Sequence, residues 1–304
     1  MLRETSAPAA SGVSRHNNVL RGVTVVIPAH NEEHGIEDGI SAVAKALDSS
    51  DWEYEIIVVD DGSSDATGER AEQHGVKVLR LDTNRGYGSA LKAGIAVAQF
   101  DWVVIIDADG TYPGAEIPRM LERVQANDMV VGARIGRNVE DPRVRRPAKW
   151  ILRKLAGYLA GQEIPDLNSG MRVIRKSLVN KFAHILPSGF SFTTTITLAL
   201  ISSGYSVSYV PIDYYRRVGK SKINPLHAFT FAFQMLRTMM LFQPMRILGP
   251  IATVLLLCGL GNLLRNLNPL RVSGTDIVLL MQGVVVWCIA MVADQNSRFH
   301  QSKR

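Results

Sequence analysis

The chain has 304 residues, which is enough for one large domain and a smaller attachment, since single hydrophobic cores stop growing near about 250–300 residues. Its 34 basic and 28 acidic residues give a net charge of +6, but no zinc-finger or aromatic RNA-binding motif accompanies this excess, so nucleic acid is not expected as a partner. Cys258 and Cys288 lie in apolar runs and provide no disulfide framework.

Short apolar runs alternate with helical patterns from Gly22 onward. We predict strands at 23–27, 55–59, 76–81, 103–106 and 129–132, and helices at 36–47, 67–74 and 88–98. Continuous apolar strands that alternate with helices are typical of a mostly parallel sheet with helices on both faces. We therefore expect a Rossmann-like α/β domain over 21–224. Residues 1–20 lack the apolar core of a signal peptide and are predicted to form a disordered tail.

Four of the predicted strands end in polar residues. These ends are Pro28-Ala29-His30-Asn31-Glu32, Asp60-Asp61, Asp107-Ala108-Asp109 and Gly132-Ala133-Arg134. Open α/β sheets bind their ligands beyond the carboxyl ends of the strands. The coincidence therefore predicts a binding site along this edge of the sheet.

Asp107 and Asp109 are two carboxylates one residue apart, directly after a buried strand. Such oxygen ligands suit Mg²⁺ or Mn²⁺ and leave coordination positions for a diphosphate. The pattern does not choose between these two ions. Asp60-Asp61 forms a second acidic strand end, and helix N-capping is its alternative role, although Asp65 is also placed to cap that helix.

Segments beyond residue 142 are predicted to associate with a lipid bilayer. Residues 143–159 form a basic amphipathic helix, with Trp150, Ile151, Leu155 and Tyr158 opposite Arg146, Lys149, Arg153 and Lys154. Residues 225–246 are rich in aromatic residues and methionine, which is typical of a helix lying in the membrane interface.

Residues 247–264 and 277–293 carry no charge, and each would span about 26 Å as a helix, near the lower limit for crossing a bilayer. We predict a transmembrane hairpin over 247–294 and a tail over 295–304. Arg246 before the first span and Arg298, Lys303 and Arg304 after the second place the α/β domain and both termini in the cytoplasm, on a multi-pass protein of the inner membrane. Gly259 and Gly261 would suit packing into a homo-oligomer.

The motifs VVIPAHNEE, IIVVDDGSSDAT, NRGYGSALKAG and VVIIDADGTYP together resemble those of glycosyltransferase family 2, inverting enzymes with the GT-A fold. VVGAR, PDLNSGMRVIRK and YYRRVGKSK, followed by two spans, are similar to the polyprenyl-phosphate branch of that family. This branch includes dolichol-phosphate mannose synthases and bacterial undecaprenyl-phosphate sugar transferases. The resemblance implies transfer of a hexose from a UDP- or GDP-linked sugar to a polyprenyl phosphate. Processive relatives carry Q-x-x-R-W, whereas Gln234-Met235-Leu236-Arg237 is followed by Thr238, so we expect a non-processive enzyme.

The same resemblance implies roles for individual residues. It places Pro28, His30, Glu32, Asp60 and Asp61 in the nucleotide pocket, Ala108 beside the ribose, Asp107 and Asp109 on the metal and diphosphate, Arg134, Arg216 and Lys222 on the phosphates, and Asp166 and Ser169 near the donor sugar and acceptor. Asp109 and Asp166 are the implied catalytic residues.

Two positions depart from the pattern. Thr111 stands where mannose synthases often carry a metal-binding Gln, and His30 replaces an aromatic residue and is expected to pack or stack on a base.

The chemical class of the acceptor is inferred from the absence of a candidate general base. No acidic residue lies between Asp166 and Asp213, although an alcohol acceptor normally needs a positioned general base. A phosphate monoester, with a second pKa of about 6, is already largely dianionic at neutral pH and needs only cations to hold it. The predicted acceptor-phosphate contacts are Arg134, Lys149, Arg153, Ser169 and Arg172, with Arg146 also available. Two alternatives stay open: a hydroxyl-bearing lipid or glycan with Asp166 as base, and a non-catalytic module that binds a nucleotide-sugar.

Overall fold

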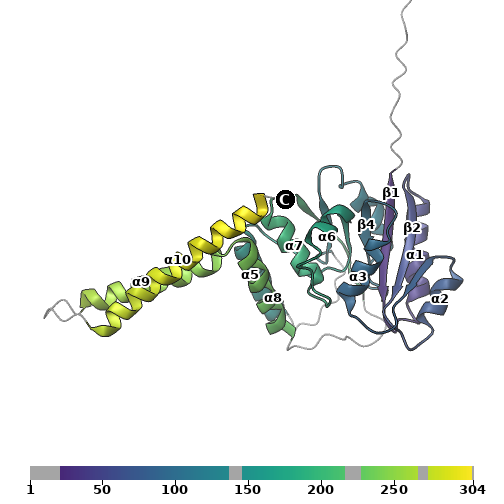
Figure 1. Ribbon diagram of the computed structural model, residues 1–304. Coiled ribbons are helices and arrows are strands. Elements are labelled where there is room, and N and C mark those ends of the chain that lie inside the picture. Colours follow the sequence, from purple (N-terminus) through teal and green to yellow (C-terminus); the bar gives the residue numbers. More distant parts are fainter. Residues whose placement is uncertain (1–20, 137–145, 216–226, 266–272, 303–304) are drawn as a thin grey trace, which may run out of the picture.

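The computed structural model describes residues 21–136, 146–215, 227–265 and 273–302 (Figure 1). It shows a sheet flanked by helices, from which two long helices project together (Figure 1). The seven strands lie in the order β3-β2-β1-β4-β6-β5-β7. This mostly parallel sheet confirms the predicted α/β class.

The strands are β1 (Gly22–Ala29), β2 (Glu53–Asp60), β3 (Lys77–Arg80), β4 (Trp102–Ile105), β5 (Met129–Ala133), β6 (Arg172–Arg175) and β7 (Val207–Pro211). The helices of the domain are α1 (Ile36–Asp48), α2 (Thr67–Gln73), α3 (Tyr87–Ala96), η1 (Gly114–Glu116), α4 (Ile117–Leu121), α5 (Arg146–Ala160), α6 (Lys176–Phe182) and α7 (Phe192–Ser202). They are followed by α8 (His227–Phe242), α9 (Met245–Arg265) and α10 (Gly274–Ser302). Each strand and helix predicted above is present, with ends that differ by a few residues.

Strand β6 is the exception to the parallel pattern, because it runs antiparallel to both β4 and β5. Its first residue, Arg172, pairs with Ile105 at the end of β4 and with Val131 in β5. The segment that enters β6 therefore arrives at the carboxyl ends of the parallel strands. β6 was not predicted, since its four residues carry an arginine at each end and show no apolar run.

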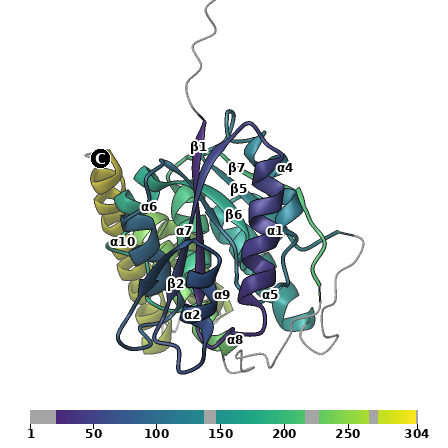
Figure 2. The same ribbon diagram turned by 90° about the vertical axis from the view of Figure 1, so that its right-hand side faces the viewer.

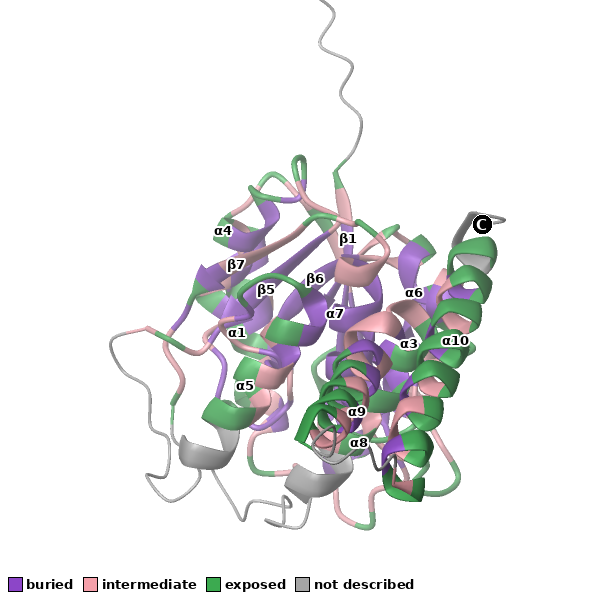
Figure 3. Ribbon diagram, turned by 90° about the vertical axis from the view of Figure 1, so that its left-hand side faces the viewer, coloured by how far each residue is buried: buried purple, intermediate pink, exposed green. Residues whose placement is uncertain are grey.

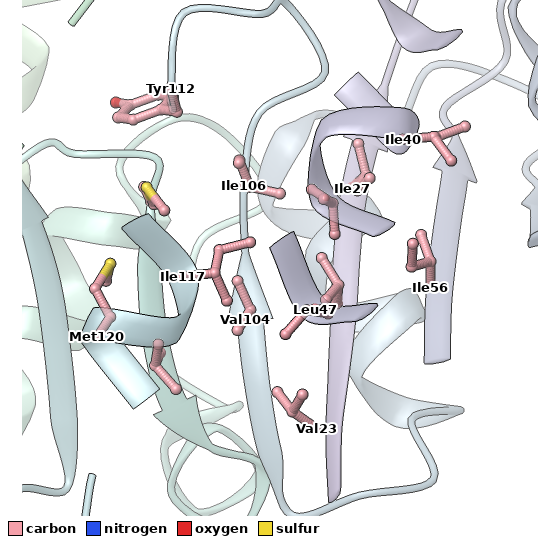
Figure 4. Close-up of a cluster of buried hydrophobic side chains, with 14 of the residues drawn as sticks. Val23, Ile27, Ile40, Leu47, Ile56, Val104, Ile106, Tyr112, Ile117 and Met120 are labelled. Carbon is pink, nitrogen blue, oxygen red and sulfur yellow. The ribbon is translucent and has the colours of Figure 1, made fainter. Parts of the chain in front are cut away.

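Two apolar cores lie on opposite faces of the sheet. The first joins β1 and β4 to α1, α2 and α4, with Ile27, Leu47 and Met120 among its buried side chains (Figures 2 and 4). The second lies under α3, α6 and α7. Helix α3 packs closely on the sheet at Gly94, where a Cβ would lie 2.6 Å from a methyl of Val26 and 2.8 Å from one of Val59. Burying both faces explains why the parallel strands are continuously apolar.

A third, smaller core joins α5, α7 and α8. Ile247 at the start of α9 packs against this core. The neighbouring Arg246 donates from Nη1 to the carbonyl oxygens of Tyr158 at 2.9 Å and Leu159 at 3.2 Å. These are carbonyls of the last turn of α5, which a helix leaves without intrahelical partners. Gly161 adopts a left-handed φ of 77°, and a Cβ there would lie 2.4 Å from the same Nη1. A glycine is therefore required for Arg246 to cap α5.

Helices α9 and α10 are both long and apolar enough to cross a bilayer, and only 17% of each apolar window is buried within the protein. Their exposed surface is visible in Figure 3. The two helices pack through glycines: a Cβ on Gly259 would meet Leu280, and one on Gly283 would meet Leu256. Gly259 thus serves contacts inside the hairpin. Beyond it, the Ser297 hydroxyl contacts the carbonyl oxygens of Leu241 at 2.8 Å and Phe242 at 2.9 Å.

Arg246→Gln is expected to loosen the C-terminal turn of α5, because hydrogen bonds from a charged donor stabilise by about 1.5–3 kcal/mol. Amide hydrogen exchange measured by mass spectrometry should become about tenfold faster for the peptide ending at Ala160. Arg265→Gln, at the exposed other end of α9, is the matched control and should leave α5 unchanged. Equal exchange in both variants would contradict the capping role.

Candidate functional site

Asp61 joins three segments at the carboxyl edge of the sheet. Its backbone N–H donates to the Ala29 carbonyl at 2.8 Å, which ties the end of β2 to β1. Its carboxylate accepts the backbone N–H of Arg85 at Oδ1 and of Gly86 at Oδ2, both at 2.8 Å. The side chain is buried. Asp61 therefore holds the loop that begins α3, and its predicted contact with a nucleotide stays a prediction.

The loop after β1 lies beside the end of β2, as the polar strand ends predicted. The His30 Nδ1–H donates to the carbonyl oxygen of Asp61 at 2.8 Å, and the Glu32 backbone N–H donates to Thr67 Oγ1 at 2.9 Å. Pro28 is part of β1 and is buried. This hydrogen bond ties His30 to the end of β2, and its expected packing or base-stacking role stays a prediction.

Asp60 and Asp65 stabilise the turn between β2 and α2. Asp60 Oδ1 accepts the Ser63 backbone N–H at 2.9 Å, and Asp65 Oδ1 accepts that of Thr67, the first residue of α2, at 3.1 Å. Asp65 thus bonds to the first residue of α2, but the N-cap position is Ala66 and neither aspartate makes a side-chain capping bond there. Asp60 keeps a buried carboxylate at the strand end.

Asp107 follows β4 and is contacted by groups from two other segments. The Tyr87 hydroxyl, at the start of α3, donates to Asp107 Oδ1 at 2.8 Å. Burial raises the pKa of Tyr87 well above its ordinary value, and the charge of Asp107 adds to this, so the hydroxyl stays a donor. Gly170 packs against the other side, where a Cβ would lie 2.2 Å from Asp107 Oδ2. Its own N–H donates to the Tyr112 hydroxyl at 2.6 Å.

Asp109 is held by Thr111, which stands at the position where relatives often carry a metal-binding Gln. Its Oδ1 accepts the Thr111 hydroxyl at 2.6 Å and the Thr111 backbone N–H at 3.2 Å. Thr111 is completely buried. Ala108, between the two aspartates, is buried with its carbonyl close to Gly35. Thr111, at the position of the expected third metal ligand, therefore orients Asp109 through hydrogen bonds.

Arg134 and Asp166 form a bidentate ion pair across the end of β5. Nε donates to Oδ2 at 2.7 Å and Nη2 to Oδ1 at 2.9 Å, and the Arg134 backbone N–H adds a third bond to Oδ2 at 3.0 Å. Burial alone would raise the pKa of Asp166, but the charge of Arg134 and these hydrogen bonds outweigh it, so the pKa lies below its usual range. The Arg134 guanidinium also lies 5.2 Å from the centre of the Tyr214 ring.

Ser169 and Arg172 were predicted to contact an acceptor phosphate, and the structure places both in the interior. Each has an exposed fraction of 0%. The Arg172 guanidinium donates to the carbonyl oxygens of Thr193 and Ser169 and to the Thr197 hydroxyl. Ser169 Oγ donates to the Gly132 carbonyl at 2.5 Å. Both residues thus brace the segment that enters β6 instead of facing a ligand.

The remaining predicted contacts are only partly described. Arg216 and Lys222 lie outside the described residues. Lys149 belongs to α5, although its side chain is not among those described. Arg153, one turn further on, is exposed. The structure therefore brings together the ends of β1, β2, β4 and β5, and leaves the basic residues of 216–222 unplaced.

Asp107 and Asp109 provide the chemistry of a small metal site. Among the described residues there is no group of three or more acidic, histidine or cysteine side chains placed to hold a metal. Mg²⁺ and related ions are commonly bound by one or two carboxylates, with phosphate oxygens and water completing an octahedron. The pair therefore fits an ion that shares its coordination with a bound diphosphate.

Three residues that shape this site were missed in the sequence. Tyr87 and Tyr112 sit within quoted motifs, but no local spacing shows that their hydroxyl groups reach Asp107 and Gly170. Gly170 lies in the NSGMR segment, and its close approach to Asp107 depends on β6 running antiparallel. Its position between a polar segment and a strand was the available signal.

Comparisons with known proteins identify the family of the chain. The model of glycosyl transferase family 2 matches residues 24–182, and that of the GtrB C-terminal hairpin matches residues 243–299. A dolichyl-phosphate hexose transferase of Haloferax volcanii is 32% identical over 67% of this chain and 87% of its own length. An undecaprenyl-phosphate 4-deoxy-4-formamido-L-arabinose transferase of Edwardsiella ictaluri is 30% identical over 79% of this chain and 74% of its own.

A solved structure shares the fold. Glucosyl-3-phosphoglycerate synthase from Mycobacterium tuberculosis, in complex with Mn²⁺, UDP and phosphoglyceric acid, matches with a TM-score of 0.59 and 21% identity, over 73% of this chain and 80% of that one. The same enzyme is also known with Mg²⁺ and UDP. The family match, the two relatives and the shared fold show that the chain belongs to glycosyl transferase family 2 and carries a GtrB-type C-terminal hairpin.

Proposed function

We propose that this glycosyltransferase moves one hexose from a UDP- or GDP-linked sugar to a polyprenyl phosphate, with inversion, at the cytoplasmic face of a membrane. The observation that carries the proposal is the ion pair of Asp166 with Arg134. A carboxylate with a lowered pKa and two bonds to arginine is a weak base. No acidic residue lies between Asp166 and Asp213. This supports an acceptor that is already ionised, and the names of the two relatives point to lipid phosphates.

In this reaction an oxygen of the lipid phosphate attacks the anomeric carbon in line. The new C–O bond forms as the bond to the donor diphosphate breaks, and the electron pair leaves with the nucleoside diphosphate. The phosphate dianion has no proton to lose, so no base is needed. A divalent cation held by Asp107 and Asp109 would stabilise the charge on the departing diphosphate. Arg134, Arg216 and Lys222 are proposed to bind phosphate groups alongside it.

The membrane placement is proposed from the exposed apolar surface. Helix α5 exposes Trp150, Ile151 and Tyr158, at 55%, 58% and 57%, and buries its other face in the third core. Amphipathic helices with aromatic and basic residues lie in the interfacial layer of a bilayer. We propose that α5 and α8 lie there, with α9 and α10 crossing the membrane, so that Lys149 and Arg153 meet the lipid phosphate close to its headgroup depth.

Asp109→Asn should abolish transfer, because it removes one of the two carboxylates proposed to hold the metal and diphosphate. We expect a loss of at least about 100-fold in the rate of product-lipid formation. Thermal unfolding and the amount in the membrane fraction should stay unchanged. Asp51→Asn, at an exposed loop before β2, is the control. Full activity of Asp109→Asn with Mg²⁺ or Mn²⁺ would rule out the metal site.

Radiolabelled donor sugars offered with polyprenyl phosphate, polyprenol and diacylglycerol should label the polyprenyl phosphate alone. Mass analysis of the product with UDP- and GDP-linked donors then identifies the sugar and nucleotide. The lipids should be presented together in one vesicle preparation, so that access is the same for each. Label on a hydroxyl-bearing lipid only would favour Asp166 as a base and would refute the phosphate acceptor.

The fall in rate at acidic pH should reflect protonation of the acceptor phosphate and not of an enzyme residue. If the dianion is the nucleophile, the rate falls as pH drops through the second pKa of the phosphate, about 6. A phosphonate analogue of the lipid, whose second pKa is higher, should move this limb to higher pH. An enzyme carboxylate acting as base would give a limb that stays in place when the acceptor is changed.

A further inference from the structure

We propose that Tyr87 and Thr111 are positioning residues that make Asp107 and Asp109 bind the metal through one oxygen each, and that they thereby select Mg²⁺ or Mn²⁺ over Ca²⁺. This inference rests on the proposed metal site. Neither residue need touch the ion or the substrate. Each engages one oxygen of its aspartate, and the same atom, Oδ1, is engaged in both cases.

The Tyr87 hydroxyl is aimed by a rigid backbone. The N-terminal turn of α3 is fixed by the Ser188 carbonyl, which accepts the backbone N–H of Gly88 at 2.7 Å and of Ser89 at 3.1 Å. The Tyr87 ring stacks on Phe190, with centroids 5.6 Å apart. The ring is thus stacked on one aromatic neighbour, and the loop before it is anchored by Asp61. Reorienting the hydroxyl would require movement of this whole assembly.

Thr111 is held equally firmly. Its side chain is completely buried, and its carbonyl oxygen accepts the Tyr215 backbone N–H at 3.0 Å. Its hydroxyl and its backbone N–H both donate to Asp109 Oδ1, so this oxygen accepts two bonds within one tight loop. Asp109 is itself buried. Rotating this carboxylate to offer both oxygens to an ion would therefore break two hydrogen bonds in the interior.

These hydrogen bonds would favour one ion over another because Ca²⁺ and Mg²⁺ differ in coordination geometry. Ca²⁺ takes six to eight oxygen ligands and readily uses both oxygens of a carboxylate, whereas Mg²⁺ requires a near-ideal octahedron. An oxygen that already accepts strong hydrogen bonds competes poorly as a second ligand from the same carboxylate. With both aspartates biased in this way, the site supplies too few oxygens for Ca²⁺ and suits an octahedral ion that keeps phosphate and water ligands.

The test is a comparison of ion affinities in full-length protein in detergent micelles. Mn²⁺ binding is followed by loss of the free-ion electron paramagnetic resonance signal, with UDP and then GDP present and nucleotide-only titrations subtracted. Ca²⁺ is then added as competitor. Tyr87→Phe keeps the ring and its stack, and Thr111→Val keeps the shape of the side chain. Tyr54→Phe is the matched control, because Tyr54 also donates to an aspartate, Asp48, at 2.5 Å but at the opposite edge of the sheet.

We expect the ratio of the Ca²⁺ to the Mn²⁺ dissociation constant to fall about tenfold in Tyr87→Phe and in Thr111→Val, in the range of other changes around metal ligands. Thr111→Ser, which restores the hydroxyl, and Tyr54→Phe should keep the wild-type ratio. If both affinities weaken together and the ratio is constant, the residues support the fold alone and the inference is overturned. If the wild type binds no Mn²⁺, or Asp109→Asn binds it equally well, the proposed metal site itself fails.

Discussion

The three hydrogen bonds between Arg134 and Asp166 organise the carboxyl edge of the sheet, because they fasten the segment that enters β6 to the end of β5. Removing one partner of this partly buried pair would leave the other charge without its compensation and would destabilise the edge of the sheet. The fastened segment carries Gly170, whose backbone closes one side of Asp107. The same pairing lowers the basicity of Asp166. A single contact therefore shapes one side of the proposed metal site and, on the proposed mechanism, limits the acceptors that suit the enzyme.

The antiparallel strand β6 gives this contact its effect. A fully parallel sheet would bring the start of each strand to the opposite edge, far from the ends where ligands bind. Because β6 is reversed, its N-terminal residue lies level with the ends of β4 and β5. Arg172 then extends inward and braces α7, while Ser169 bonds back to Gly132. The interior positions of these two residues are a consequence of that reversal.

The parts of the fold and of the site that a local sequence pattern encodes could be predicted, and the parts that depend on distant contacts could not. The strands β1, β2, β4 and β5 are continuous apolar runs that end in polar residues, so their direction and the position of Asp107 and Asp109 could be inferred. The direction of β6 depends on pairing with strands distant in the chain, and its four residues carry no such signal. Arg172 was therefore assigned to a ligand, although it is buried. The role of Thr111 could not be predicted from the sequence either. It depends on the side-chain rotamer that directs its hydroxyl to Asp109.

The hairpin is attached to the catalytic domain at both of its ends. Arg246 at the start of α9 closes α5, and Ser297 near the end of α10 contacts the last carbonyls of α8. Two attachments oppose the swivelling that a single linker would allow. On the proposed topology, they set the height of the domain above the bilayer through α5 and α8. A lipid substrate must then bring its phosphate to that height.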